Sequence, residues 1–264
     1  MIVTTVRKNA QRLEPKAKEL ASLLQAPFMS RGGDSVETLQ RRFEQEVIVV
    51  GSEKIQFFPK DSADPFFYHP NSAFVRIKQI EKKQLEPLKA ASDLQAGMSF
   101  LDCTLGLASD SLVAQYLVGE SGRVIGVEEN FVIATLVQIG LNSWTDGRAD
   151  LLDLMKKITV KHAHHLDYLK EQPDNSFDVV YFDPMFEQAI LESKGISGLR
   201  SLAHYGTISE EAIQEAKRVA KHRVVLKDHW QSSRFSQFQF SVLKRGHAAF
   251  HYGFLDMNKK DLHD

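Results

Sequence analysis

From Met98 onward, short apolar runs alternate with longer amphipathic segments. This alternation predicts strands that are each followed by a helix, the pattern of a parallel sheet with crossover helices. The last two apolar runs flank Arg245-Gly246 and predict an antiparallel hairpin. The expected fold class is therefore α/β, a doubly wound, Rossmann-like sheet with a C-terminal antiparallel hairpin. The predicted strands are Ser99–Cys103, Arg123–Val127, Ile158–Lys161, Phe177–Phe182, Arg223–Lys227, Phe240–Leu243 and Ala248–Leu255, and the predicted helices are Ser109–Val118, Asn130–Trp144, Asp150–Met155 and Ser209–Lys221.

The first 90 residues show a different, mixed pattern. Pro15 suits the first turn of a helix, and Ser35 is a typical N-cap residue. The expected elements are a strand at Ile2–Val6, helices at Pro15–Gln25, Ser35–Glu46 and Ser72–Lys83, and a hairpin over Val47–Phe58. We predict a small N-terminal α+β extension, residues 1–90, and a larger domain, residues 91–264.

The composition is that of a globular protein. The 264 residues are 43% hydrophobic and 25% charged, with a single cysteine, Cys103. One cysteine excludes an intramolecular disulfide, and no N-terminal apolar stretch suits a secretory signal, so we expect a cytoplasmic protein. The longest apolar run, Phe131–Leu141, is too short to span a bilayer.

Charge is unevenly distributed, although the formal net charge is only −1. Residues 1–90 contain 15 Lys and Arg against 11 Asp and Glu, a net charge of +4, which leaves −5 for the remainder. The small total therefore combines a mildly basic extension with an acidic larger domain, and the net charge alone gives no reason to expect nucleic acid.

Candidate ligand-binding residues follow the first two strands of the predicted sheet, where open α/β sheets bind ligands. Asp102 lies at the end of the first strand, Gly106 lets the loop turn tightly, and Ser109 opens a helix whose free N–H groups face the same space. Glu128 follows the second strand, 22 residues beyond Gly106, where a carboxylate can accept both hydroxyls of an adenosine ribose. The alternatives are an ordinary tight turn and a solvated surface acid.

The most informative segment follows the apolar strand Phe177–Phe182 and reads Asp183-Pro184-Met185-Phe186. Asp183 and a backbone carbonyl near Pro184 can accept the N–H groups of an exocyclic amine, and Phe186 offers an aromatic face to a flat heterocycle. We predict that Asp183, Pro184 and Phe186 are catalytic. Asp183 would orient the amine and stabilise the charge that develops on its nitrogen. The alternative is a tight turn with a buried Phe.

The segments DCTLGLASD, VIGVEEN, KHAHHLD and YFDPMF, in this order, resemble class I methyltransferases that use S-adenosylmethionine (SAM). Within that class the chain is similar to the small-subunit ribosomal RNA guanine-N2 methyltransferase J family over about Ser99–Leu255. The resemblance implies methyl transfer from SAM to an exocyclic amine, with guanine N2 of small-subunit ribosomal RNA as the favoured acceptor. The implied partner is ribosomal RNA or the small ribosomal subunit. Under this resemblance the mildly basic extension, residues 1–90, would contact RNA, and the acidic domain would hold the cofactor.

The resemblance also implies which residues line the cofactor site, and the loop chemistry described above adds Asp102 and Gly106. The full predicted set is Asp102, Gly106, Ser109, Asp110, Glu128, Glu129, His164, His165 and Asp183. Three departures concern the RNA target more than the cofactor. Ala108 replaces a usual glycine, Glu187 stands where the family tends to have proline and basic residues, and residues 1–90 match poorly.

Two other functions compete with this interpretation. An NAD-dependent oxidoreductase would share the strand, loop and helix and the acid after the second strand, but it leaves Asp183–Phe186 unexplained. A methyltransferase-like domain without catalysis could bind RNA or a protein.

Other polar residues have weaker interpretations. His162, His164 and His165 do not predict a metal site, because adjacent strand residues point to opposite faces. Lys227 and Lys244-Arg245 are candidates for phosphate contacts, with solvated strand ends as the alternative.

Overall fold

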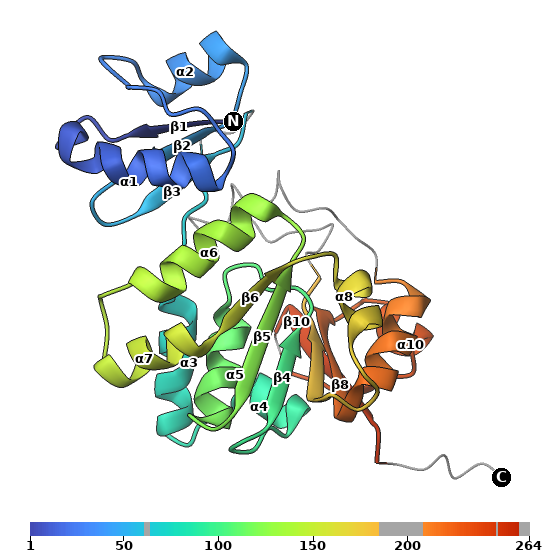
Figure 1. Ribbon diagram of the computed structural model, residues 1–264. Helices are drawn as coiled ribbons and strands as arrows, with labels where there is room; N and C mark the ends of the chain where they lie inside the picture. Colours follow the sequence, from blue (N-terminus) through green and yellow to red (C-terminus); the bar gives the residue numbers. More distant parts are fainter. Residues whose placement is uncertain (61–63, 185–207, 247, 259–264) are drawn as a thin grey trace. The chain divides into compact units, whose positions relative to one another are not determined.

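The computed structural model of the protein describes residues 1–60, 64–184, 208–246 and 248–258 (Figure 1). The described chain divides into two compact units. Residues 1–68 form the N-terminal unit, and the described residues from His69 onward form the sheet unit. None of the described helices has the length and apolar composition needed to cross a membrane.

The N-terminal unit contains a three-stranded sheet with the order β1-β2-β3. β1 and β2 pair in parallel, because two helices lie between them in sequence, and β2 turns back on β3 in an antiparallel hairpin. Leu39 packs against Ile2, Val47 and Val49 on one face of the sheet. The elements are β1 Ile2–Thr5, α1 Ala10–Leu23, α2 Val36–Phe43, β2 Val47–Val50 and β3 Ile55–Phe58.

Helix α1 begins earlier than the sequence predicts, so Pro15 lies inside it and not in its first turn. An internal proline removes a backbone hydrogen bond and costs about 3 kcal/mol. Leu13, Ala17, Leu20 and Ala21 are all buried, with the i, i+4, i+7, i+8 spacing of one helix face. Starting the helix at Pro15 would leave Leu13 outside that buried face.

The sheet unit is built on seven strands in the order β6-β5-β4-β7-β8-β10-β9. β6, β5, β4, β7 and β8 run parallel, while β10 pairs antiparallel with both β8 and β9, which confirms the predicted closing hairpin. The strand order reverses between β4 and β7. The strands are β4 Ser99–Asp102, β5 Arg123–Glu128, β6 Thr159–His162, β7 Phe177–Phe182, β8 Ala220–His229, β9 Ser241–Leu243 and β10 Phe250–Asp256.

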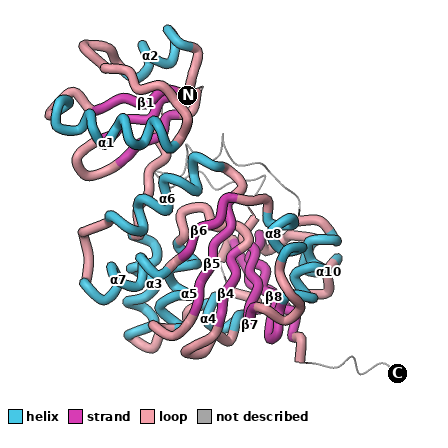
Figure 2. The backbone as a smooth tube through the Cα atoms, viewed as in Figure 1, coloured by secondary structure: helices cyan, strands magenta, loops and turns pink. Residues whose placement is uncertain are grey.

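Helices cover both faces of this sheet (Figure 2). On one face α5 contacts α3, α4 and α7; on the other, α8 and α10 pack against each other. Leu169 of α8 and Ile213 of α10 share a buried cluster with Leu101 of β4 and Val180 of β7. The helices are α3 Asn71–Glu81, α4 Pro87–Ser92, α5 Ser109–Val118, α6 Phe131–Ser143, α7 Ala149–Lys157, α8 His165–Glu171, α10 Glu210–Val219 and α11 Arg234–Gln237.

The α/β prediction with a doubly wound sheet is confirmed, but the unit boundary differs from the one expected at residue 90. The described units divide after Tyr68, because α3 and α4 contact α5 of the large sheet's helical layer. Helices α4 and α8 are not among the elements predicted from the sequence.

Candidate active site

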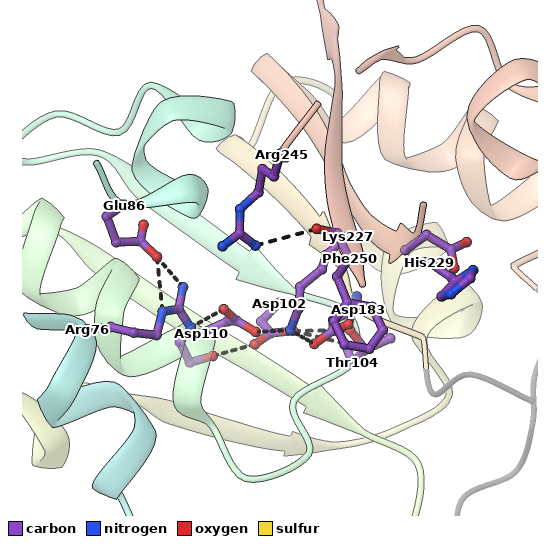
Figure 3. A network of polar contacts seen from close by, with 12 residues as sticks. Arg76, Glu86, Asp102, Thr104, Asp110, Asp183, Lys227, His229, Arg245 and Phe250 are labelled. Carbon is purple, nitrogen blue, oxygen red and sulfur yellow. Dashed lines mark hydrogen bonds and ion pairs between the residues drawn. The ribbon is translucent and has the colours of Figure 1, made fainter. Parts of the chain in front are cut away.

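Polar and charged side chains meet where the strand order reverses, at the carboxyl ends of the parallel strands. This is where ligands bind in open α/β sheets. Figure 3 shows side chains from α3, α5, β8 and the ends of β4 and β7 directed toward one another. The site is therefore assembled from segments far apart in the sequence.

The end of β4 is fixed to the end of β7 by hydrogen bonds. Asp102 is buried, and its Oδ2 accepts from Ser111 Oγ at 2.7 Å while its Oδ1 accepts from the Thr104 backbone N–H at 3.0 Å. The Thr104 hydroxyl accepts in turn from the Asp183 backbone N–H at 2.6 Å. Burial raises the pKa of Asp102 to about 7; the Ser111 hydroxyl opposes that rise and the nearby Asp110 carboxylate adds to it.

The loop after β4 is also tied to the end of β5. The Gly106 N–H donates to Glu128 Oε2 at 3.2 Å, and the Asn130 N–H donates to Glu128 Oε1 at 2.9 Å. Burial raises the pKa of Glu128, although the two hydrogen bonds oppose this rise because they stabilise the carboxylate. Ala108, with φ 58°, occupies the left-handed region that favours glycine, so the backbone keeps this conformation although a side chain is present.

Ser109 opens helix α5 with a buried hydroxyl that has no hydrogen-bond partner among the described residues. A buried polar atom without a partner is costly, and the first N–H groups of a helix also lack intrahelical partners. The start of α5 is therefore suited to a polar group of a small ligand. The assignment of Ser109 to the cofactor site stays a prediction.

A chain of alternating charges runs through the centre of the site (Figure 3). Arg76 of α3 donates to Glu86 Oε1 through Nε at 3.0 Å and Nη2 at 2.6 Å, and through Nη1 to Asp110 Oδ1 at 2.5 Å. The Lys227 ammonium lies 3.4 Å from Asp110 Oδ2 and 2.5 Å from Asp183 Oδ2. Two cations thus hold three carboxylates, each largely removed from solvent.

These contacts affect the pKa values of the two aspartates in opposite directions. Burial favours the neutral acid in both, but Lys227 and Arg76 outweigh it at Asp110, and the pKa of that carboxyl is well below its usual range. At Asp183, burial and the neighbouring Asp110 carboxylate outweigh Lys227 and raise the pKa. Burial opposes the charge of Lys227, but Asp110 and Asp183 raise its pKa overall.

The predicted histidines lie at the carboxyl end of β6. His164 caps α8, its Nδ1 accepting from the Leu166 N–H at 3.3 Å, and the His165 ring centroid is 4.3 Å from that of His164. Burial, with a smaller effect of His164, lowers the pKa of His165 to about 4. Within the described ranges, no three His, Cys, Asp or Glu side chains are arranged to hold a metal ion.

The remaining predicted residues have mixed positions. Glu129 is exposed, and its backbone carbonyl lies 3.0 Å from His162 Nε2. Pro184 is buried directly after Asp183, whereas Phe186 lies outside the described residues. Lys227, expected as a phosphate contact or a solvated strand end, instead lies between two aspartates.

Sequence reasoning missed Arg76, Glu86 and Thr104. Arg76 and Glu86 were assigned to the N-terminal extension, 34 and 24 residues before Asp110, where no local pattern connects them with the sheet. A charged residue on a predicted amphipathic helix is ordinarily interpreted as solvent-facing, so only packing reveals its role.

Comparisons with known proteins identify a family and several relatives with similar sequences. Residues 47–245 match the model of a family described as "Putative SAM-dependent methyltransferase". The chain is 45% identical to "Uncharacterized protein YpiP" of Bacillus subtilis, over 96% of this chain and 98% of that protein. It is 33% identical to the ribosomal RNA small subunit methyltransferase J of Buchnera aphidicola, over 49% of this chain and 51% of that protein.

Among solved structures, a SAM-dependent methyltransferase from Neisseria gonorrhoeae matches with a TM-score of 0.61 and 14% sequence identity. The match covers 99% of this chain and 98% of that one. At this low sequence identity, the match shows that the two proteins share a fold.

Proposed function

The chain belongs to the SAM-dependent methyltransferase family and is thus an enzyme with SAM as its cofactor, and we propose that its acceptor is an exocyclic amine, guanine N2 of small-subunit ribosomal RNA. Bound SAM supplies a methyl group on a positively charged sulfur, which leaves as a neutral thioether when the new N–C bond forms. The protein then has to position the amine and accommodate the change in charge. Membership of this family also disfavours the alternative function, that of an NAD-dependent oxidoreductase.

The observation that carries the proposal is the position of Asp183. Its backbone N–H is held by Thr104 and its Oδ2 by Lys227, so the carboxylate is fixed at the carboxyl end of β7. Each carboxylate oxygen has two lone pairs, so Asp183 retains capacity to accept an N–H from an amine. A fixed acceptor can turn the nitrogen lone pair toward the methyl group and stabilise the positive charge that develops on nitrogen.

Lys227 supports this role by favouring the ionised form of Asp183. After methyl transfer the cationic nitrogen loses its proton to solvent water, so Asp183 acts as an orienting and stabilising group more than as a strong base. The ring of the buried Pro184 fixes the φ angle of that residue, and a backbone carbonyl near Pro184 is the second proposed acceptor.

We assign cofactor binding to the residues around the β4 and β5 loops. Glu128, oriented by two backbone N–H groups, would hold the ribose hydroxyls, and the partnerless Ser109 hydroxyl would bind a polar group of the cofactor. The neutral side chain of His165 and its neighbour His164 would lie beside the adenine. Asp102, Gly106 and Asp110 would support the cofactor site. Glu129 would contact the cofactor at the exposed edge of that site.

The RNA target is supported by the resemblance to methyltransferase J proteins, which align with about half of this chain. Those relatives are named as methyltransferases of small-subunit ribosomal RNA. Contact between residues 1–90 and RNA is part of the same proposal.

The first test replaces Asp183 with Asn and with Ala. We expect each variant to lose at least about 100-fold in kcat while still binding SAM, because an amide accepts fewer amine hydrogen bonds and adds no negative charge. Methyl transfer is measured on free ribosomal RNA and on small subunits from cells that lack the protein, with the product nucleoside identified by mass spectrometry.

Glu120→Gln, an exposed carboxylate just beyond the C-terminal end of α5 and outside the charged chain, serves as the matched control for loss of one negative charge. Wild-type turnover by Asp183→Ala would contradict the role of Asp183. SAM binding without transfer to any RNA by the wild-type protein would favour the non-catalytic alternative and overturn the proposed acceptor.

A further inference from the structure

An aromatic cluster, formed by His229, Trp230 and Phe250, lies next to the charged site at the carboxyl end of β8. In the antiparallel ladder of β8 and β10, Lys227 is opposite Tyr252, and His229 is opposite Phe250. Directly opposed residues share a face, and residues two apart on a strand also share it, about 7 Å apart. The face that carries Lys227 therefore continues into His229 and Phe250, toward the carboxyl end of β8.

The rings in this cluster contact one another. The centroids of His229 and Phe250 are 6.4 Å apart and nearly perpendicular, and the Trp230 ring is 5.9 Å from His229. The backbone N–H of Trp230 donates to the Ala249 carbonyl at 3.0 Å, which fixes the turn after β8 to the start of β10. The cluster is thus held by two paired strand ends.

The cluster does not belong to the hydrophobic core. His229 and Phe250 are half-buried, and Trp230 remains 53% exposed. The nearby core uses other rings, Phe235, Phe238 and Phe240, each less than 10% exposed. An indole this exposed, next to two further rings, is available to a flat ligand.

A positive charge borders the aromatic cluster. Arg245 is exposed, and its Nη1 lies 3.4 Å from the Phe250 carbonyl oxygen, which places the guanidinium over the start of β10 (Figure 3). No carboxylate is paired with Arg245 among the described residues. Aromatic faces beside a guanidinium that has no carboxylate partner in the described part of the chain match the bases and phosphates of single-stranded nucleic acid.

We propose that His229, Trp230 and Phe250 form the binding face for the target base, an unpaired guanine in RNA, with Arg245 on an adjacent phosphate. The inference rests on the proposed function, because it uses Asp183 as the acceptor of the guanine amine. The Lys227 ammonium contacts Asp183, and His229 follows Lys227 on the same strand face. The cluster thus follows the lysine that contacts Asp183, and in this proposal the edge of the stacked base reaches Asp183.

Stacking side chains on β8 and β10 suit a target base that has left its duplex. A base inside a duplex cannot reach an acceptor at the end of β7, so the target must be unstacked from its neighbours. Rings on the adjacent strands replace the stacking that the base loses, and an adjacent phosphate anchors the extruded nucleotide.

The first experiment measures binding independently of catalysis. The chain has two tryptophans, so Trp144→Phe leaves Trp230 as the single indole reporter. The probe is a single-stranded oligoribonucleotide with one guanine, compared with the same oligonucleotide carrying an abasic site there. We expect the guanine probe to quench Trp230 fluorescence and to bind at least about tenfold more tightly than the abasic probe.

The second experiment separates stacking from general stability. Phe250→Ala should raise the Kd for the guanine probe and the KM for RNA by about tenfold or more, with the Kd for SAM unchanged. Phe250→Tyr keeps a ring and should bind within about threefold of the wild type. Tyr116→Ala, which removes a partly exposed ring near the far end of α5, is the matched control.

Arg245→Gln should weaken binding of both probes equally and reduce the slope of log K against log salt by about 0.7. Equal affinity of wild type and Phe250→Ala for the guanine probe, in a variant with native circular dichroism, would overturn the base-binding face. The proposed function fails separately, if the wild-type protein binds the probe but forms no N2-methylguanine in ribosomal RNA.

Discussion

At the residue scale, the chemistry of the site depends on charges that share partners. Asp110 and Asp183 compete for the ammonium of Lys227, and Arg76 gives Asp110 a second cation that Asp183 lacks. This inequality explains why the pKa of Asp110 is lowered while that of Asp183 is raised. The aspartate proposed to accept the amine is therefore the one whose charge depends on a single lysine.

Replacing Lys227 with Met should shift the pH profile of the reaction. Asp183 must be ionised to accept the amine, and its pKa is raised to about 6, so wild-type kcat/KM should fall as the pH drops through that value. Removing the ammonium raises this pKa further, because an opposite charge at this distance lowers a carboxyl pKa by about 1 to 3 units. The acidic limb of the profile should therefore move to higher pH by about one unit or more.

Lys227→Arg, which retains the positive charge, is the control and should keep the acidic limb near its wild-type position. The free energy of unfolding should be measured for both variants, because loss of one partner from a buried ion pair costs about 3 to 5 kcal/mol. An unchanged acidic limb in folded Lys227→Met would disprove the coupling between Lys227 and Asp183.

At the element scale, most helices and strands follow from local signals. Ser35 and Ser209 accept the N–H groups of Thr38 and Ala212, and these caps begin α2 and α10 where the sequence predicts. β7 and α5 have the predicted bounds. Burial overrode the local signal at Pro15, and α4 was missed because its six residues are too few to show a helical period.

One glycine determines how the β4 loop packs on the neighbouring strand. A Cβ on Gly126 of β5 would lie 2.2 Å from Leu105 Cδ1 and 3.0 Å from Leu105 Cγ. Gly126→Ala should therefore displace the loop, lower the free energy of unfolding by about 1 to 3 kcal/mol and weaken SAM binding.

Denaturant unfolding and calorimetric titration with SAM check both effects. Gly246→Ala is the matched substitution, because a Cβ there meets nothing within 4 Å; it should alter stability by less than about 0.5 kcal/mol. Unchanged stability and SAM affinity in Gly126→Ala would show that the loop tolerates displacement.

At the scale of the whole molecule, the boundary between units changes the interpretation of charge. Residues 1–68 contain ten Lys and Arg against nine Asp and Glu, whereas residues 69–90 contain five against two. Most of the basic excess predicted for the extension thus belongs to α3, α4 and the segment between them, within the sheet unit. RNA attraction is then expected from the sheet unit itself.

Neutralising Lys78, Lys82 and Lys83, all exposed, should weaken RNA binding and reduce its salt dependence. If each contacts a phosphate, the slope of log K against log salt falls by about 0.7 to 0.9 per lysine. The triple Gln variant is compared in filter binding with Lys8, Lys16 and Lys60→Gln, an equal loss of charge from exposed positions of the N-terminal unit. A larger loss in the second variant would assign RNA capture to residues 1–68.

The sequence by itself determined the alternation of strands and helices, the antiparallel closing hairpin and the acidic residue after β7, because periodicity, caps and turn residues act over a few positions. It also placed Asp102, Gly106 and Glu128 at strand ends that a parallel sheet brings together. Only the tertiary structure decided that Arg76 and Lys227, 34 and 117 residues from Asp110, would both reach it. The aromatic face of His229 and Phe250 likewise depends on the register of β8 and β10. Contacts across such separations depend on how whole elements pack, which no short sequence pattern specifies.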